Sequence, residues 1–364
     1  MSDVNAPAST KIPVTVLTGY LGAGKTTLLN RILSENHGKK YAVIVNEFGE
    51  VGIDNDLIIG ADEEVFEMNN GCVCCTVRGD LVRILEGLMK RKGKFDAIIV
   101  ETTGVADPAP VAQTFFVDED VQNNARLDAV VTVADAKWLS ERLKDAPEAK
   151  NQIAFADVIV LNKTDLVSKS ELAEVEGRIR GINPYAKLHH TERCQVALSD
   201  VLERGAFDLD RILELEPDFL AKDDHDHHHD HDHHHDHHDH DHGHHHDHDH
   251  GHEHDHDHGL KHYHDEEMQS MSLRSDKPLD QEKFMPWLQG LLAAEGQKIL
   301  RSKGILAFAD DNDRYVFQGV HMMLEGSRQR EWKPNEKRES RVVFIGRELP
   351  EALIREGFQN CIAA

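Results

Sequence analysis

The stretch from Thr18 to Thr27 (TGYLGAGKTT) places the strongest constraint on how this chain folds. It matches the phosphate-binding pattern G-x-x-x-x-G-K-[ST]. An apolar run at residues 12–17 precedes it and an amphipathic run at residues 26–33 follows it, which predicts a strand, a tight turn and a helix. In that context backbone N–H groups and the helix N-terminus converge on phosphate groups, so the sequence predicts a nucleotide site.

The residues of this loop are predicted to bind the nucleotide: Gly19, Tyr20, Leu21, Gly22, Ala23, Gly24, Lys25, Thr26 and Thr27. Lys25 is expected to reach the β- and γ-phosphates, and the Thr26 hydroxyl is expected to bind Mg²⁺. A glycine-rich turn that binds nothing is the alternative, and the flanking strand and helix argue against it.

Short β-branched runs alternate with amphipathic helical runs over residues 11–205. The runs read as buried strands lie at residues 41–45, 95–100, 128–133 and 157–161, and a further strand is predicted at residues 64–68. This alternation predicts an α/β fold with a doubly wound, mostly parallel sheet and ligands at the carboxyl ends of its strands. Glu101 and Gly104 follow one such strand; Glu101 is expected to hold the Mg²⁺ shell and Gly104 to donate its N–H to the γ-phosphate.

A second nucleotide motif, Asn162-Lys163-Thr164-Asp165, follows the strand at residues 157–161. The Asp165 carboxylate can accept from both N1–H and N2–H₂ of guanine, a pair of donors that adenine lacks, so it favours GTP over ATP. Asn162 is expected to brace the neighbouring loop, and the stem of Lys163 to lie on the base. Lys25, Thr26 and Glu101 are the candidate catalytic residues of the resulting GTPase.

Two segments between the nucleotide motifs carry metal-binding side chains. Glu47, Glu50 and Asp54 follow the strand at residues 41–45, where the γ-phosphate and Mg²⁺ are expected. They are predicted to bind metal or to respond to the nucleotide, with Asp54 as a Mg²⁺ ligand beside Thr26 and Glu101; a solvated polar loop is the alternative. The second segment holds Cys72, Cys74 and Cys75 just before a helix. Three thiols in four residues suit a thiophilic d-block cation, with Glu47, Glu50 or a histidine as a further ligand. Buried inert cysteines or a redox pair are the alternatives.

These motifs resemble the CobW family of GTPases, relatives of the nickel-inserting GTPases of urease and hydrogenase maturation. The resemblance is carried by residues 19–27, 46–50, 71–75, 101–104, 162–165, 301–306 and 317–322, which together span nearly the whole chain. The family's Cys-x-Cys-Cys motif corresponds to Cys72, Cys74 and Cys75. The resemblance implies a metallochaperone whose GTP cycle is coupled to binding and releasing a transition metal.

Residues 225–258, from His225 to His258, hold 21 histidines and 11 acids in 34 positions. Such a composition buries little apolar area, so a disordered linker is expected. Neutral imidazoles bind Zn²⁺, Ni²⁺, Co²⁺ and Cu²⁺, which predicts many weak metal sites; an inert solubilising linker is the alternative. The predicted domains are a flexible N-terminus (1–10), a P-loop GTPase domain (11–205), this linker (206–267) and a small α+β domain (268–364) with a mostly antiparallel sheet.

The composition of the chain excludes some classes of binding partner. The formal net charge of −25 argues against a nucleic-acid or anionic-membrane surface. The polar N-terminus and the lack of a long apolar run predict a cytoplasmic protein, and Cys194 and Cys361 lack the spacing of ligands and are read as structural.

Together, these features predict a GTP-hydrolysing metallochaperone that uses GTP/GDP and Mg²⁺ and hands Zn²⁺ to a client metalloprotein. Co²⁺ or Ni²⁺ as the ion is left open, with cobalt delivery for cobalamin synthesis or nitrile hydratase activation as the family alternative. A histidine-rich metal-storage protein and a redox-sensing regulatory G protein are alternatives of other classes. A homodimer is also left open.

Overall fold

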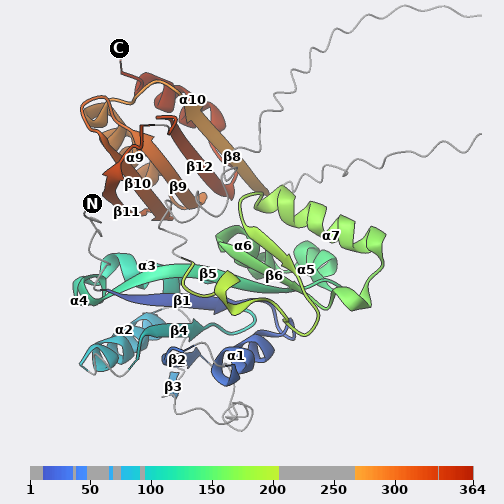
Figure 1. Cartoon of the computed structure of the whole chain (residues 1–364). Coiled ribbons are helices and arrows are strands. Elements are labelled where there is room, and N and C mark those ends of the chain that lie inside the picture. The colour runs from blue at the N-terminus through green and yellow to red at the C-terminus, as the bar shows by residue number, and fades with distance from the viewer. Residues whose placement is uncertain are drawn as a thin grey trace, which may run out of the picture.

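The computed structural model describes residues 11–35, 38–46, 65–68, 75–90, 95–204, 267–334 and 336–363 (Figure 1). The amino-terminal part forms a seven-stranded sheet in the order β3-β2-β4-β1-β5-β6-β7, in which every pair of neighbours is parallel. Its strands are β1 (Ile12–Thr18), β2 (Tyr41–Asn46), β3 (Val65–Met68), β4 (Ala97–Glu101), β5 (Ala125–Asp135), β6 (Val158–Asn162) and β7 (Lys187–His190). β4 and β6 are buried at all five positions, as expected for strands with both faces covered.

Helices cover the two faces of this sheet unequally. The described helices are α1 (Lys25–Ser34), α2 (Cys75–Met89), α3 (Ala109–Val117), α4 (Glu119–Asn124), α5 (Leu139–Asp145), α6 (Pro147–Phe155) and α7 (Lys169–Ile182), with short 3₁₀ turns η1 (Thr164–Leu166) and η2 (Leu198–Asp200). One face packs against α1 and residues 194–202, and the other against α2 to α7. Successive strand residues alternate between these two cores, as Val130 and Val131 of β5 do.

The carboxy-terminal part is an α+β unit built on a five-stranded antiparallel sheet in the order β11-β10-β9-β12-β8. Its elements are β8 (Met268–Ser275), α9 (Gln281–Glu295), β9 (Ile299–Ala307), β10 (Asp313–Val320), β11 (Met323–Glu331), β12 (Ser340–Arg347) and α10 (Glu351–Asn360). Phe284, Leu288 and Phe358 bind α9 and α10 to one face of the sheet through a core of their own. The predicted fold class, a doubly wound parallel sheet with a smaller α+β domain, is confirmed.

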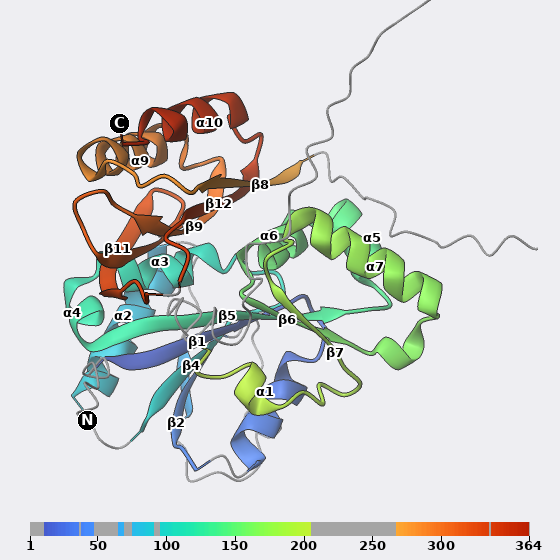
Figure 2. The same ribbon diagram turned by 45° about the horizontal axis from the view of Figure 1, so that its top comes forward.

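The other face of the antiparallel sheet packs against the first domain, above α3 and α6, as Figure 2 shows. Met268, Leu300, Val320, Val343 and Ile345 of the carboxy-terminal domain are buried in the same apolar core as α3 and α6. The two domains therefore share one hydrophobic core, and separating them would expose this apolar surface to water.

A buried ion pair reinforces this shared core. Asp157, which lies between α6 and β6, accepts a hydrogen bond from Arg301 at 3.0 Å and contacts Lys303 of β9. Burial opposes ionisation of Asp157, but the two cations outweigh it and lower the pKa of the carboxyl. Burial lowers the pKa of Lys303 to about 8, against the attraction of Asp157.

The structure adds two edge strands, β7 and β11, that the sequence did not predict. The proposed linker, residues 206–267, lies almost wholly outside the described residues, so those domain limits stay predictions. Among the residues described here, no helix is long and apolar enough to cross a membrane.

Candidate nucleotide site at the carboxyl edge of the parallel sheet

The loop between β1 and α1 has a backbone that needs glycine. Gly19 and Gly24 have φ angles of 142° and 117°, which L-residues rarely adopt. A Cβ at Gly19 would lie 2.1 Å from the Val133 carbonyl oxygen, and one at Gly24 would lie 2.6 Å from Nδ2 of Asn162. The loop therefore packs directly on β5 and β6, and only glycine at these two positions permits that approach.

Lys25 is the first residue of α1, and its side chain is buried over the loop. Its Nζ donates a hydrogen bond to the Gly19 carbonyl oxygen at 2.9 Å. The ammonium group therefore lies within the concave side of the loop, close to the N-terminus of α1. This is the place at which a helix N-terminus and a lysine attract phosphate.

The segment after β4 lies against the same loop. β4 pairs with β1, and the Thr102 hydroxyl donates to the Thr18 hydroxyl at 2.8 Å. Glu101 is buried at the end of β4, and a Cβ on Gly104 would lie 2.6 Å from the backbone nitrogen of Leu21. The structure thus brings Glu101 and Gly104 to the edge of the sheet occupied by the phosphate-binding loop.

Asn162 links this loop to the segment after β7. Its Nδ2 donates to the Ala23 carbonyl oxygen at 3.0 Å, and its Oδ1 accepts from the backbone N–H of Cys194 at 2.8 Å. The Thr191 hydroxyl lies 3.3 Å from the same Oδ1. Asn162 is 2% exposed, so these contacts satisfy a buried amide and fix two loops to each other.

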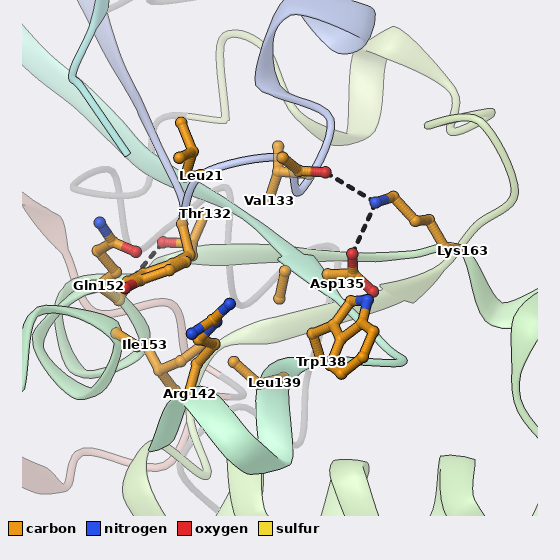
Figure 3. Close-up of a pocket in the computed structure, with 14 residues that line it drawn as sticks. Leu21, Thr132, Val133, Asp135, Trp138, Leu139, Arg142, Gln152, Ile153 and Lys163 are labelled. Atoms are coloured by element: carbon orange, nitrogen blue, oxygen red, sulfur yellow. Dashed lines mark hydrogen bonds and ion pairs between the residues drawn. The ribbon is translucent and has the colours of Figure 1, made fainter. Parts of the chain in front are cut away.

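Lys163 crosses from β6 to the tip of the phosphate-binding loop. Its Nζ donates to Asp135 at 2.6 Å and to the Gly22 carbonyl oxygen at 2.7 Å (Figure 3). Asp165 lies two residues further on in η1 and is exposed. Its carboxylate is therefore accessible to a base, beside a lysine stem that is already held in place.

A cavity of about 300 Å³ lies next to the loop, on the side of α5 and α6 (Figure 3). Its lining residues are Tyr20, Leu21, Gly22, Thr132, Val133, Ala134, Asp135, Trp138, Leu139, Arg142, Ala149, Gln152, Ile153 and Lys163. The Arg142 guanidinium lies 5.1 Å from the centre of the Tyr20 ring, a cation–π contact across the mouth. The sequence did not predict this wall of α5 and α6, because nothing in its composition marks it as a binding surface.

The predicted metal ligands are only partly within the described residues. Cys75 is the first residue of α2, whereas Glu47, Glu50, Asp54, Cys72, Cys74 and the His225 to His258 tract lie outside the described residues. The strands that lead to both segments are described, however, and Asn46 at the end of β2 pairs with Met68 at the end of β3. Both segments therefore leave the sheet at the edge that carries the phosphate-binding loop.

Comparison with known proteins identifies the family. Residues 13–190 match the model of the CobW/HypB/UreG nucleotide-binding domain, and residues 268–362 match that of the cobalamin synthesis protein CobW carboxy-terminal domain. The chain belongs to the CobW family. This CobW-family chain is a P-loop GTPase with the family's carboxy-terminal domain, so the predicted resemblance is confirmed.

Relatives match over nearly the whole CobW-family chain. The zinc chaperone YjiA of Escherichia coli is 33% identical over 354 residues, covering 95% of this chain and 98% of the relative. The zinc chaperone CobW of Pseudomonas aeruginosa is 34% identical over 385 residues, covering 97% and 92%. The crystal structure of Zn(II)-bound YjiA GTPase from E. coli superimposes with a TM-score of 0.69 at 30% identity, over 97% of this chain and 99% of that chain.

The structure also assigns places to residues that the motifs did not single out. Cys194, read from the sequence as structural, is fully buried and its thiol lies 3.4 Å from the Gly24 carbonyl oxygen. Burial raises the pKa of this thiol to about 11, so it stays protonated and unreactive at neutral pH. Asp135, which holds Lys163, has no sequence signature beyond its place at the end of a strand.

Proposed function

We propose that this protein is a GTP-hydrolysing metallochaperone that binds Zn²⁺ and passes it to a client metalloprotein. The observation that carries the nucleotide part is the convergence of Gly19 to Thr27, Gly104 and Asn162 to Asp165 on one edge of the sheet. Zinc is favoured because the relatives that match over nearly the whole chain are named zinc chaperones, and because Cys72 and Cys74 precede α2 and Cys75 is its first residue.

The hydrolytic step needs oxygen ligands for Mg²⁺ and a fixed phosphate cradle. The Thr26 hydroxyl and the buried Glu101 carboxylate are hard oxygen donors, the kind that Mg²⁺ prefers, and we assign them to hold it. When bound, Mg²⁺ would supply the charge that stabilises the transferring phosphoryl group. Lys25 would neutralise the β- and γ-phosphates, and the backbone N–H of Gly104 would donate to the γ-phosphate.

Coupling to the carried ion follows from where β2 and β3 end. Glu47, Glu50 and Asp54 follow β2, and Cys72, Cys74 and Cys75 follow β3, so both sets are attached at the nucleotide edge. We propose that GTP orders the residues after β2 and aligns the thiolates around one Zn²⁺, and that hydrolysis loosens this site. The His225 to His258 tract would collect zinc weakly, and the protein would act in the cytoplasm, where thiols stay reduced.

Zinc affinity in two nucleotide states tests this proposal. Chelator competition would be measured for the full chain and for a variant lacking residues 222–262, with Mg²⁺ and either GDP or a non-hydrolysable GTP analogue. We expect one tight Zn²⁺ site in both proteins, at least about tenfold tighter in the GTP-like state, or about 1.4 kcal/mol. Cys74→Ala should abolish it.

The same titrations separate the alternatives. Equal Zn²⁺ affinity in the two nucleotide states would contradict the coupling. If the variant that lacks residues 222–262 binds no Zn²⁺ at all, metal storage would be favoured. Nucleotide-dependent binding confined to Co²⁺ would favour cobalt delivery. A loss of two hydrogens on mild oxidation, in protein purified without metal, would favour redox sensing.

A further inference from the structure

The amide of Gln152 on α6 holds the segment that follows β4. Its Nε2 donates to the carbonyl oxygens of Gly104 and Ala106, at 3.2 Å each. The backbone carbonyl oxygen of Gln152 accepts from the Thr132 hydroxyl of β5 at 2.7 Å, and Gln152 is 1% exposed. Gln152 therefore ties the Gly104 segment to a helix that is itself fixed to the sheet.

The preceding residue, Asn151, joins that segment to the carboxy-terminal domain. Its Nδ2 donates to Asp107 at 2.8 Å, and its Oδ1 accepts from the Arg347 guanidinium at 2.8 Å. The other oxygen of Asp107 accepts from the backbone N–H of Ala109 at 2.8 Å, at the start of α3. One amide side chain thus bridges the segment after β4 and the end of β12, which lie in different domains.

Arg347 is itself held in place. Its backbone N–H donates to the Lys298 carbonyl oxygen at 2.8 Å, and β12 carries Val343 and Ile345 in the core shared by both domains. The carboxy-terminal domain and the residue just before it also contact α6 at two further positions. Near its start Lys150 pairs with Glu267 at 2.8 Å, and the His321 ring lies 5.8 Å from that of Phe155 near its end.

We propose that Arg347, Asn151 and Gln152 are positioning residues for GTP hydrolysis, through which the carboxy-terminal domain sets the Gly104–Asp107 segment. Gly104 packs against the backbone of Leu21, so a shift of this segment changes the phosphate cradle directly. Asn151 and Gln152 lie on α6 and Arg347 lies at the end of β12, and all three act on the reaction only through Gly104. Because such coupling is reciprocal, a change in the position of Gly104 between the GTP and GDP states also affects the carboxy-terminal domain, through Asn151. The inference rests on GTP hydrolysis at this site and is independent of which metal is carried.

Substitutions in the link formed by Arg347, Asn151 and Asp107 distinguish an effect on the position of the Gly104–Asp107 segment from an effect on folding. Arg347→Ala removes the donor to Asn151, and Asn151→Asp keeps the acceptor for Arg347 but loses the donor to Asp107. We expect each to lower kcat for GTP about three- to tenfold, part of the effect of losing a hydrogen bond made by a charged group because the link acts on the reaction indirectly, with KM and GDP affinity within about twofold of wild type. The double variant should be no worse than either single one, because each cuts the same link. Arg355→Ala on the exposed face of α10 is the matched control and should leave kcat unchanged.

Hydrogen–deuterium exchange of the full chain with GDP tests the link without relying on turnover. Residues 104–109 should exchange faster in Arg347→Ala than in wild type, while β10 and α9 should not. Unchanged kcat and exchange, additive effects in the double variant, or a parallel fall in kcat, GDP affinity and melting temperature would each overturn the inference. If wild-type protein binds GTP but does not hydrolyse it, the proposed function fails, and the exchange result still decides whether the link exists.

Discussion

At the scale of single residues, the site depends on side chains that fasten one loop to another. Asn162 joins the phosphate-binding loop to residues 191–196, and Lys163 joins it to Asp135. These residues occur in a recognisable motif because each must reach a backbone group or a carboxylate fixed by another strand. Asp165, the last residue of the motif, is exposed and accessible to a base.

Removing the Asp165 carboxylate should remove the preference for guanine. For Asp165→Ala we expect GTP affinity to fall about 100-fold while ATP affinity changes little, because two charge-assisted hydrogen bonds to the base are lost. Titration with fluorescent GTP and ATP derivatives measures both constants. Asp145→Ala, at an exposed position on α5, is the control. An unchanged GTP to ATP ratio would contradict the assignment of Asp165.

The glycines of the loop make a sharper prediction about backbone conformation. Gly24→Ala places a Cβ 2.6 Å from the Asn162 amide at a φ of 117°, so we expect a loss of about 1–3 kcal/mol in the free energy of unfolding, together with loss of nucleotide binding. Gly290→Ala is the matched control. It lies inside α9 with open space around its Cβ position and should stabilise the protein by up to about 1 kcal/mol in urea unfolding. Equal effects of the two substitutions would contradict this view of the loop.

At the scale of secondary-structure elements, buried strands were predictable and edge strands were not. β4 and β6 read as apolar runs because both faces are covered. β11 is largely exposed and carries charged side chains, so no hydrophobic alternation marks it. It forms because its backbone pairs with β10, a contact that depends on the tertiary arrangement of the sheet.

The start of β12 carries an acid-sensitive cluster. Burial opposes ionisation of Glu339, but Arg274, Lys337 and Arg341 outweigh it and lower its pKa to about 2. A carboxyl whose pKa is lower in the folded state stabilises folding at pH values above its unfolded pKa. That contribution disappears as the pH falls from about 4.5 towards 2.

Glu339→Gln should therefore make the free energy of unfolding depend less steeply on pH in the acid range. We expect the substitution to cost on the order of 3 kcal/mol at neutral pH and progressively less as the pH approaches 2. Denaturant unfolding between pH 7 and pH 2.5 measures the difference. Glu282→Gln, on the exposed side of α9, should leave the shape of the curve unchanged. A constant difference between Glu339→Gln and wild type across this range would refute the coupling to protonation.

At the scale of the whole molecule, the carboxy-terminal domain is an integral part of the GTPase. Its sheet contributes Leu300, Val320 and Val343 to the core that also contains α6. The Asp157 ion pair lies at the same interface, one residue before β6 and thus at the other end of the strand that leads to Asn162. Loss of this interface is expected to affect both domains.

Removing the Asp157 ion pair tests whether the two domains unfold as one unit. Asp157→Asn leaves two cations buried without their carboxylate, so we expect the free energy of unfolding to fall by about 3–5 kcal/mol. The two domains of the wild type should unfold in one transition, because they share a core. Arg178→Ala removes a partly exposed pair with Glu174 on α7 and should cost less than about 1 kcal/mol. Two well-separated transitions in wild type, or equal costs for the two variants, would contradict this account.

The sequence by itself determined the phosphate-binding loop, the guanine motif, the parallel and antiparallel sheets and the family. These features depend on local requirements, such as glycine at left-handed φ angles or apolar runs in buried strands, which leave a pattern within a few residues. The predicted ligands after β2 and β3 and in the histidine tract are still predictions, since no described side chain tests them.

Only the tertiary structure decided how these parts are joined. The Asn162 to Ala23 contact spans 139 residues, and the Arg347 to Asn151 contact spans 196. Asn151, Gln152 and Cys194 carry no motif because their roles depend on which backbone groups lie opposite them. The positions of those backbone groups depend on how the two domains pack around one core. The residue order within a single strand or helix does not reveal that packing.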